Sequence, residues 1–149
     1  MNKRMAIGMM MATLFGCQSP NTLPEGDILS MEYSVQGMER YPSVCLSLFW
    51  KDGHYFFTDA SGCDLEEAQT VIVPDSVAIR IKQIMEEEQM MAYNREYKPL
   101  IPLSDGEQWR LTVRFKDSDI ALISSGWGKQ PNGNGLARIR QLLQNSQPF

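Results

Sequence analysis

Few side chains in this sequence are of the kinds that carry catalysis or hold metals. His54 is the single histidine among 149 residues, so a zinc site or a Ser-His-Asp triad would have to be built on it. It directly follows Asp52-Gly53, a dipeptide typical of a two-residue hairpin turn. A turn tip neither orients a general base nor excludes water, so we expect no catalytic role for His54 and no metal site.

Two cysteines, Cys45 and Cys63, are candidates for disulfide chemistry once Cys17 is set aside for the reason given below. An even pair in an exported chain favours a disulfide. Pairing the strands around the predicted turn puts Cys45 opposite Ala60, and the bridge is reachable if the chain curls back after Gly62. The alternative is a pair of inert thiols. A nucleophile would need a partner base, and none is identifiable.

Acidic residues are the remaining basis for an enzyme. Asp59 lies in a predicted strand, and Asp105 and Glu107 lie in a predicted loop. No carboxylate pair has a spacing that places both members in a common cleft, as glycoside hydrolysis requires. The sequence therefore predicts a protein without catalytic activity or cofactor, and a small hydrolase ranks third among the functions considered.

The glycine-rich segment 126–135, GWGKQPNGNG, precedes a predicted helix. Backbone amides at such a helix start can hold an anion, with Lys129 assisting, although the segment matches neither a Walker A loop nor a dinucleotide fingerprint. An aromatic residue in such a loop is often a contact residue, which singles out Trp127. The candidate ligand-binding residues are thus Trp127, Lys129, Asn132 and Asn134. The alternative is a connecting loop in which Asn134 caps the helix.

The first residues have the pattern of an export signal. Lys3 and Arg4 precede an apolar stretch, 5–15, that is too short to span a bilayer. Residues 14–17, LFGC, follow. They resemble the lipobox of bacterial lipoproteins, in which a small residue precedes the cysteine that becomes the mature N-terminus. The resemblance implies a signal peptide over 1–16 and a diacylglycerol thioether with an acylated amine on Cys17, which anchor the chain stably to a membrane.

The resemblance also implies a location. Gln18 replaces the aspartate common in inner-membrane lipoproteins, which favours the outer membrane, and the lack of an acidic run after Cys17 favours its periplasmic face. Removing Lys3 and Arg4 with the signal changes the net charge from −4 to −6, so nucleic acid is not an expected partner. The leading hypothesis is a cell-envelope lipoprotein that binds an envelope protein or cell-wall component. An anion- or glycan-binding module using loop 126–135 is the alternative.

Periodicity indicates the elements that must position these residues. Residues 18–27 are polar with two prolines, which predicts a tether over 17–27 and a single domain over 28–149. Alternating apolar and polar residues or short apolar runs predict strands, and apolar residues at helical spacing predict two helices. The strands are expected over 29–35, 44–50, 54–59, 70–73, 109–115 and 119–124, and the helices over 75–91, capped by Asp75 or Ser76, and 135–144.

The predicted fold class is α+β: a mainly antiparallel sheet with two helices on one side. Centring the first turn on Asp52-Gly53 pairs Trp50 with Tyr55 and leaves Phe49 on the outer face. Segment 45–52, CLSLFWKD, aligns with 110–117, RLTVRFKD, at three identical positions. This alignment is expected either from a duplicated ββα unit or from two unrelated amphipathic hairpins.

The second half carries a further resemblance. It contains Asp105-Gly106, then Trp109-Arg110-Leu111, then Ser124-Ser125-Gly126, then Pro131 before a helix. This order is similar to small uncharacterised lipoproteins of gut anaerobes, a family without an assigned activity. It supports the fold and the location and implies no chemistry.

Overall fold

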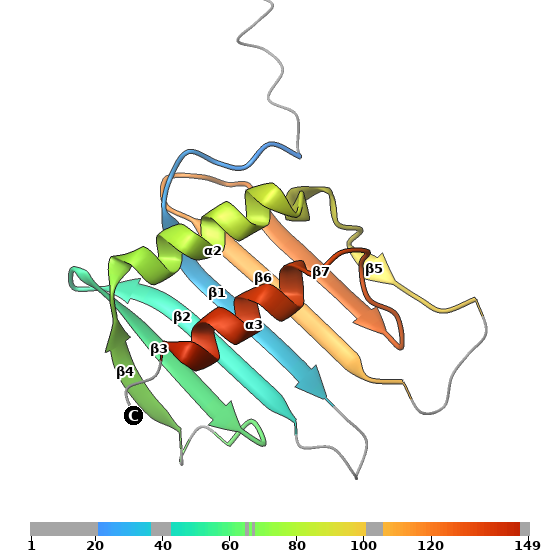
Figure 1. Cartoon of the computed structure of the whole chain (residues 1–149), viewed down its shortest axis with the longest axis horizontal. Coiled ribbons are helices and arrows are strands. Elements are labelled where there is room, and N and C mark those ends of the chain that lie inside the picture. The colour runs from blue at the N-terminus through green and yellow to red at the C-terminus, as the bar shows by residue number, and fades with distance from the viewer. Residues whose placement is uncertain (1–20, 37–42, 65, 67, 101–105, 147–149) are drawn as a thin grey trace, which may run out of the picture.

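One sheet dominates the structure. The computed structural model describes residues 21–36, 43–64, 66, 68–100 and 106–146. Seven strands form a sheet in the order β4-β3-β2-β1-β6-β7-β5 (Figure 1). Every strand pair is antiparallel except β5 with β7. The strands are β1 (Ile28–Gln36), β2 (Val44–Lys51), β3 (His54–Ser61), β4 (Gln69–Val73), β5 (Glu96–Tyr97), β6 (Gln108–Phe115) and β7 (Ala121–Trp127).

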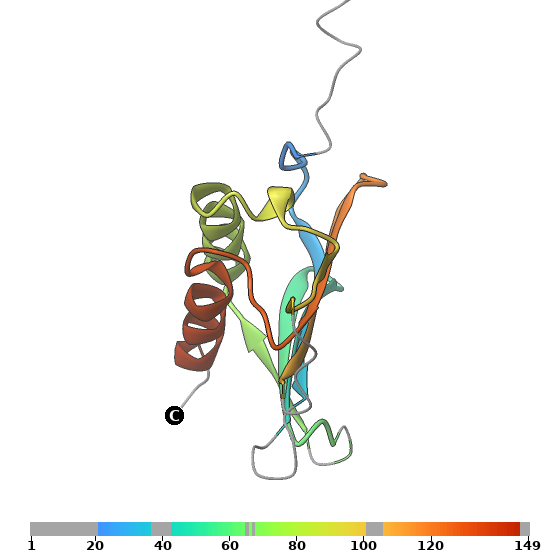
Figure 2. The ribbon, with the colours of Figure 1, turned by 90° about the vertical axis from the view of Figure 1, so that its right-hand side faces the viewer.

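Both long helices lie on the same side of this sheet (Figure 2). They are α2 (Asp75–Glu87) and α3 (Gly135–Asn145), and a short 3-10 helix, η1 (Met90–Ala92), follows α2. The predicted α+β class, with a mainly antiparallel sheet and two helices on one side, is confirmed. No helix within the described ranges is long and apolar enough to cross a membrane.

Alternation along the strands separates two surfaces, which we call the covered face and the open face. The covered face packs against the helices and holds the core, which includes the fully buried Met31, Leu48, Phe57 and Val113. The helices contribute buried Val77, Ile81, Met85, Ile139 and Leu143. The open face carries the alternate residues, and no second layer covers it in the described part of the chain.

The first hairpin forms as predicted. Asp52 and Gly53 both have positive φ, 52° and 82°, as a two-residue turn of this type needs. Trp50 lies opposite Tyr55, and their rings meet edge to face at 4.8 Å. Lys116, from the turn after β6, places its ammonium 3.7 Å above the Trp50 ring.

Several boundaries differ from expectation. The first helix ends at Glu87 rather than near residue 91, because Gln89 adopts a left-handed conformation with φ 50°. Pro74, not Asp75 or Ser76, occupies the N-cap, without a side-chain cap bond. Strand β7 extends to Trp127, so the start of the predicted glycine-rich loop belongs to the sheet.

Residues 23–27 differ from the expected tether because they contact the folded domain. Leu23 packs against the core. Lys82 donates hydrogen bonds to the carbonyls of Glu25 and Gly26, at 2.8 and 2.7 Å. The folded part of the chain therefore begins before Ile28.

The sheet order does not confirm the duplicated unit. Strands β2 and β6 both run antiparallel to β1 and flank it on either side. The hairpin partner of β2 is β3, which lies on the side of β2 that faces away from β1. The hairpin partner of β6 is β7, which lies on the side of β6 that faces away from β1. The two hairpins therefore extend from β1 in opposite directions. Two copies related by a shift along the sheet would place these partners on the same side.

Candidate functional site

The predicted ligand residues of segment 126–135 separate into two locations. Trp127 ends β7 on the open face, whereas Lys129 and Asn132 line a hollow beside the end of α2. At the start of α3, the backbone N–H of Asn134 donates to the carboxylate of Glu88 at 3.2 Å. The Asn134 side chain makes no cap bond.

This helix start is therefore already occupied by an anionic group of the protein. Arg138 of α3 also bonds Glu88, at 3.1 Å, and Glu87, at 2.6 Å. The hydrogen bond from Arg138 lowers the pKa of Glu87, and its two carboxylate partners raise the pKa of Arg138. Burial, with a contribution from Glu88, raises the pKa of Tyr93 in the same hollow to about 12. An external anion would have to compete with Glu88 here.

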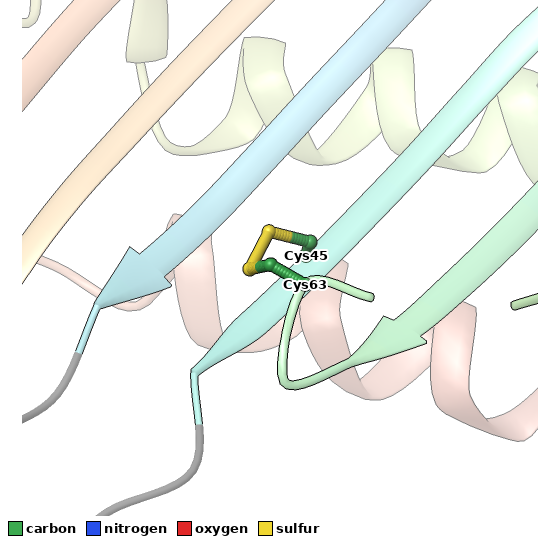
Figure 3. The surroundings of a disulfide bond; sticks show 2 residues. All are labelled: Cys45 and Cys63. Carbon is green, nitrogen blue, oxygen red and sulfur yellow. A yellow bond between two sulfur atoms is a disulfide. The ribbon is translucent and has the colours of Figure 1, made fainter. Parts of the chain in front are cut away.

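The disulfide is present. Cys45 and Cys63 are bridged, with their Cα atoms 5.1 Å apart. The turn that brings them together uses positive φ at Gly62 and at Cys63 itself. Figure 3 shows the bridge in front of the strands with the helices behind, which places it on the open face. Cys45 is also the cross-strand neighbour of Ser34.

The residues considered for catalysis are not brought together. His54 begins β3 and is exposed, opposite Lys51. Asp59 lies on β3 and Glu107 precedes β6, on the opposite side of β1. Asp105 and Cys17 lie outside the described residues. Within the described ranges, no three His, Cys, Asp or Glu side chains gather closely enough to hold a metal ion.

Two rows of mainly polar side chains lie next to each other on the open face, at one end of the strands. One row runs across β1, β6 and β7 as Gln36, Gln108 and Trp127. The second row, two residues away along the same strands, is Ser34, Arg110 and Ser125, with Glu96 of β5 beside Ser125. Cross-strand neighbours have Cβ atoms about 5 Å apart, so these side chains form one contiguous surface.

A cleft of about 330 Å³ lies over this surface, and we call it the Arg110–Trp127 cleft. All members of both rows line it, together with Lys98, Tyr97, Trp109 and Gly126. The Trp127 side chain is 37% exposed. In the described part of the chain, the side chains of Gln36, Gln108 and Arg110 make no hydrogen bond or ion pair, so their polar groups are available to a ligand.

The backbone around Trp127 is held tightly. The indole of Trp109 donates to the carbonyl of Lys129 at 2.8 Å and packs so closely on Gly126 that a Cβ there would lie 2.3 Å from Nε1. The N–H of Gly128 donates to the carbonyl of Glu107 at 2.9 Å, which extends the β6–β7 pairing past Trp127. The aromatic side of the cleft is thus built on a fixed strand end rather than on a loop.

A second cleft, of about 440 Å³, lies between α2 and the entering chain. It is lined by Leu23, Trp50, Tyr55 and Ile79 among others. Its two lysines are already engaged, Lys82 with the carbonyls of residues 25 and 26 and Lys116 with the Trp50 ring. The lysines of this cleft are therefore already used within the protein, and its other charged lining residues are the acids Asp27, Asp75 and Glu86.

Of the cleft residues, the sequence singled out Trp127 and missed Arg110, Gln36 and Gln108. Their signal was present, because each occupies the polar position of an alternating strand. Alternation does not say which strands are neighbours, and β1 pairs with β6 across more than 70 residues of chain. No protein-family model and no curated protein sequence matches this chain.

Proposed function

We propose that this chain is a membrane-anchored cell-envelope lipoprotein whose folded part is a non-catalytic binding domain with the open face as its ligand surface. The observation that carries the binding role is the Arg110–Trp127 cleft. Its exposed aromatic ring and three polar side chains that have no partner among the described residues come from three neighbouring strands of the sheet. Preformed clefts with a few convergent polar groups are the usual form of binding sites.

The anchoring part of the proposal is supported by residues 14–17, LFGC, and by the basic residues Lys3 and Arg4 that begin the export signal. Membrane attachment suits a binding domain, because holding it near its target raises the effective concentration of a weak partner. Gln18 favours the outer membrane and its periplasmic face as the location.

Replacing Cys17 with Ser tests the anchor. We expect Cys17→Ser to leave the membrane fraction and to lack the acylated N-terminus in mass spectrometry of the full chain. A Cys17→Ser protein that stays in membranes would contradict the anchor without affecting the binding role.

Capture of partners from the native envelope tests the binding role. Full-length wild type, Trp127→Ala and Ile123→Ala serve as baits. Ile123 is a matched control, because it lies on the open face of the same strand, is 38% exposed and does not line the cleft. We expect Trp127→Ala to lose the captured component and Ile123→Ala to keep it. Equal capture by all three baits would contradict the cleft as the ligand surface.

A further inference from the structure

We infer that the Arg110–Trp127 cleft binds a carboxylate-bearing sugar of an acidic glycan. The inference rests on the proposed function, because it names the ligand class of the same surface. Four properties of the cleft select this class: its dimensions, its aromatic ring, the mixed donors and acceptors, and its charge.

The dimensions fit one or two sugar rings. Three side chains across neighbouring strands span about 10 Å. The two rows lie two residues apart, which corresponds to about 7 Å along the strands. The Trp127 ring at one corner offers a flat apolar surface within a polar cleft. A sugar presents such a surface on the side of the ring where its C–H groups point, so stacking on Trp127 buries apolar area on both partners.

The polar side chains match hydroxyl groups. The amides of Gln36 and Gln108 and the hydroxyl of Ser34 each offer donors as well as acceptors, whereas the Ser125 hydroxyl, which donates to the carbonyl of Arg95 at 3.4 Å, offers an acceptor. A sugar hydroxyl is also both a donor and an acceptor. A phosphate group accepts hydrogen bonds, so the acceptor oxygens of this set would be left without partners against it.

The positive charge of the cleft favours a sugar that carries an acidic group. Among the described residues, three charged ones line the cleft: Glu96, Lys98 and Arg110. Lys98 and Glu96 neutralise each other in an ion pair at 3.3 Å, so the lining retains one positive charge, on Arg110. The planar guanidinium of an arginine matches a carboxylate with two parallel hydrogen bonds. Among the described lining residues Glu96 is the single acid, so these residues alone do not supply the pair of carboxylates needed to hydrolyse a glycosidic bond.

Titration calorimetry of the full-length protein with defined oligosaccharides tests this inference. The probes are oligomers of galacturonate, mannuronate and glucuronate, with neutral glucose oligomers of equal length as the comparison. We expect at least one uronate series to bind, with an affinity that falls as salt rises, and the neutral oligomers to bind at least about tenfold more weakly.

Arg114 supplies the matched control. It lies on the open face of the same strand, four residues from Arg110, and does not line the cleft. Arg110→Gln should weaken uronate binding by at least about tenfold, whereas Arg114→Gln should keep it within about twofold. Uronate binding should change the tryptophan fluorescence of the wild type. Trp127→Ala should abolish both the binding and this fluorescence change.

Three results would overturn the inference: no binding of any uronate oligomer, equal binding of neutral oligomers, or equal losses from Arg110→Gln and Arg114→Gln. If uronates fail while capture from the envelope still depends on Trp127, the ligand class is wrong and the proposed binding function stands. If capture is also independent of Trp127, both are wrong.

Discussion

The covered and open faces of the sheet are made by the same strands, yet they serve different ends. On β6, Trp109, Leu111 and Val113 are buried, while Arg110 and Arg114 between and beside them are exposed. Alternate residues of one strand therefore have different roles. One set stabilises the fold, and the other set is available to bind a ligand. Single substitutions on adjacent positions can separate stability from binding.

The largest expected difference between the faces is at Leu111 and Thr112. Leu111 is 1% exposed in the core, so Leu111→Ala should lower the free energy of unfolding by about 3 kcal/mol. Thr112→Ala, on the open face, should change it by less than about 0.5 kcal/mol. Urea denaturation followed by circular dichroism measures both. Similar losses at the two positions would mean that the open face is covered in solution.

The Cys45–Cys63 disulfide is a covalent link on the open face, and its removal should have an effect of similar size. The bridge closes a segment with a sequence separation of 18, which corresponds to about 3 kcal/mol in the chain-entropy account of disulfides. We expect the double variant Cys45→Ala with Cys63→Ala to lose about this much. Wild type unfolded in the presence of reductant is the control and should match it. No difference between oxidised and reduced wild type would show that the bridge constrains nothing.

A smaller, pH-dependent effect is expected from Tyr55 on the covered face. Its hydroxyl donates to the carbonyl of Ile28 at 2.7 Å, and burial raises its pKa to about 12. Because the folded state favours the neutral phenol, this stabilisation is complete below the unfolded pKa of 10 and is lost as pH rises from 10 to 12.

Tyr55→Phe tests this expectation. The variant should lose about 1 kcal/mol at neutral pH. Its stability should then decline less steeply than that of wild type above pH 10, while the other tyrosines with a raised pKa, Tyr33 and Tyr93, keep part of the decline. Parallel declines in wild type and variant would place the Tyr55 hydroxyl outside the core. Denaturant unfolding at several alkaline pH values measures the slopes.

The sequence predicted what local periodicity determines. The strands, the Asp52-Gly53 turn and the pairing of Trp50 with Tyr55 follow from alternation and from one turn dipeptide, and all three are found. Strand β5, by contrast, has two residues and pairs in parallel with β7, so it has no period to detect. The end of the first helix at Glu87 depends on the left-handed Gln89, which has no distinctive sequence signal.

The cleft was missed for a different reason. Gln36 and Trp127 come to the same row only because β1 lies beside β6 and β6 beside β7. That order is set by packing against two helices, not by any single segment. A local pattern can mark each residue as outward-facing without indicating which outward-facing residues become neighbours.

The central position of β1 has a mechanical consequence for an anchored protein. The entering chain leads directly into β1 at Ile28, and the cleft residues Ser34 and Gln36 lie at the other end of the same strand, about 26 Å away. A load between the proposed lipid anchor and a bound ligand would therefore run along β1. Since β1 is paired on both sides, with β2 and with β6, such a pull would shear two ladders of hydrogen bonds at once instead of peeling an edge strand bond by bond. The two hydrogen bonds from Lys82 to the entering chain lie ahead of these ladders on the path from the proposed anchor.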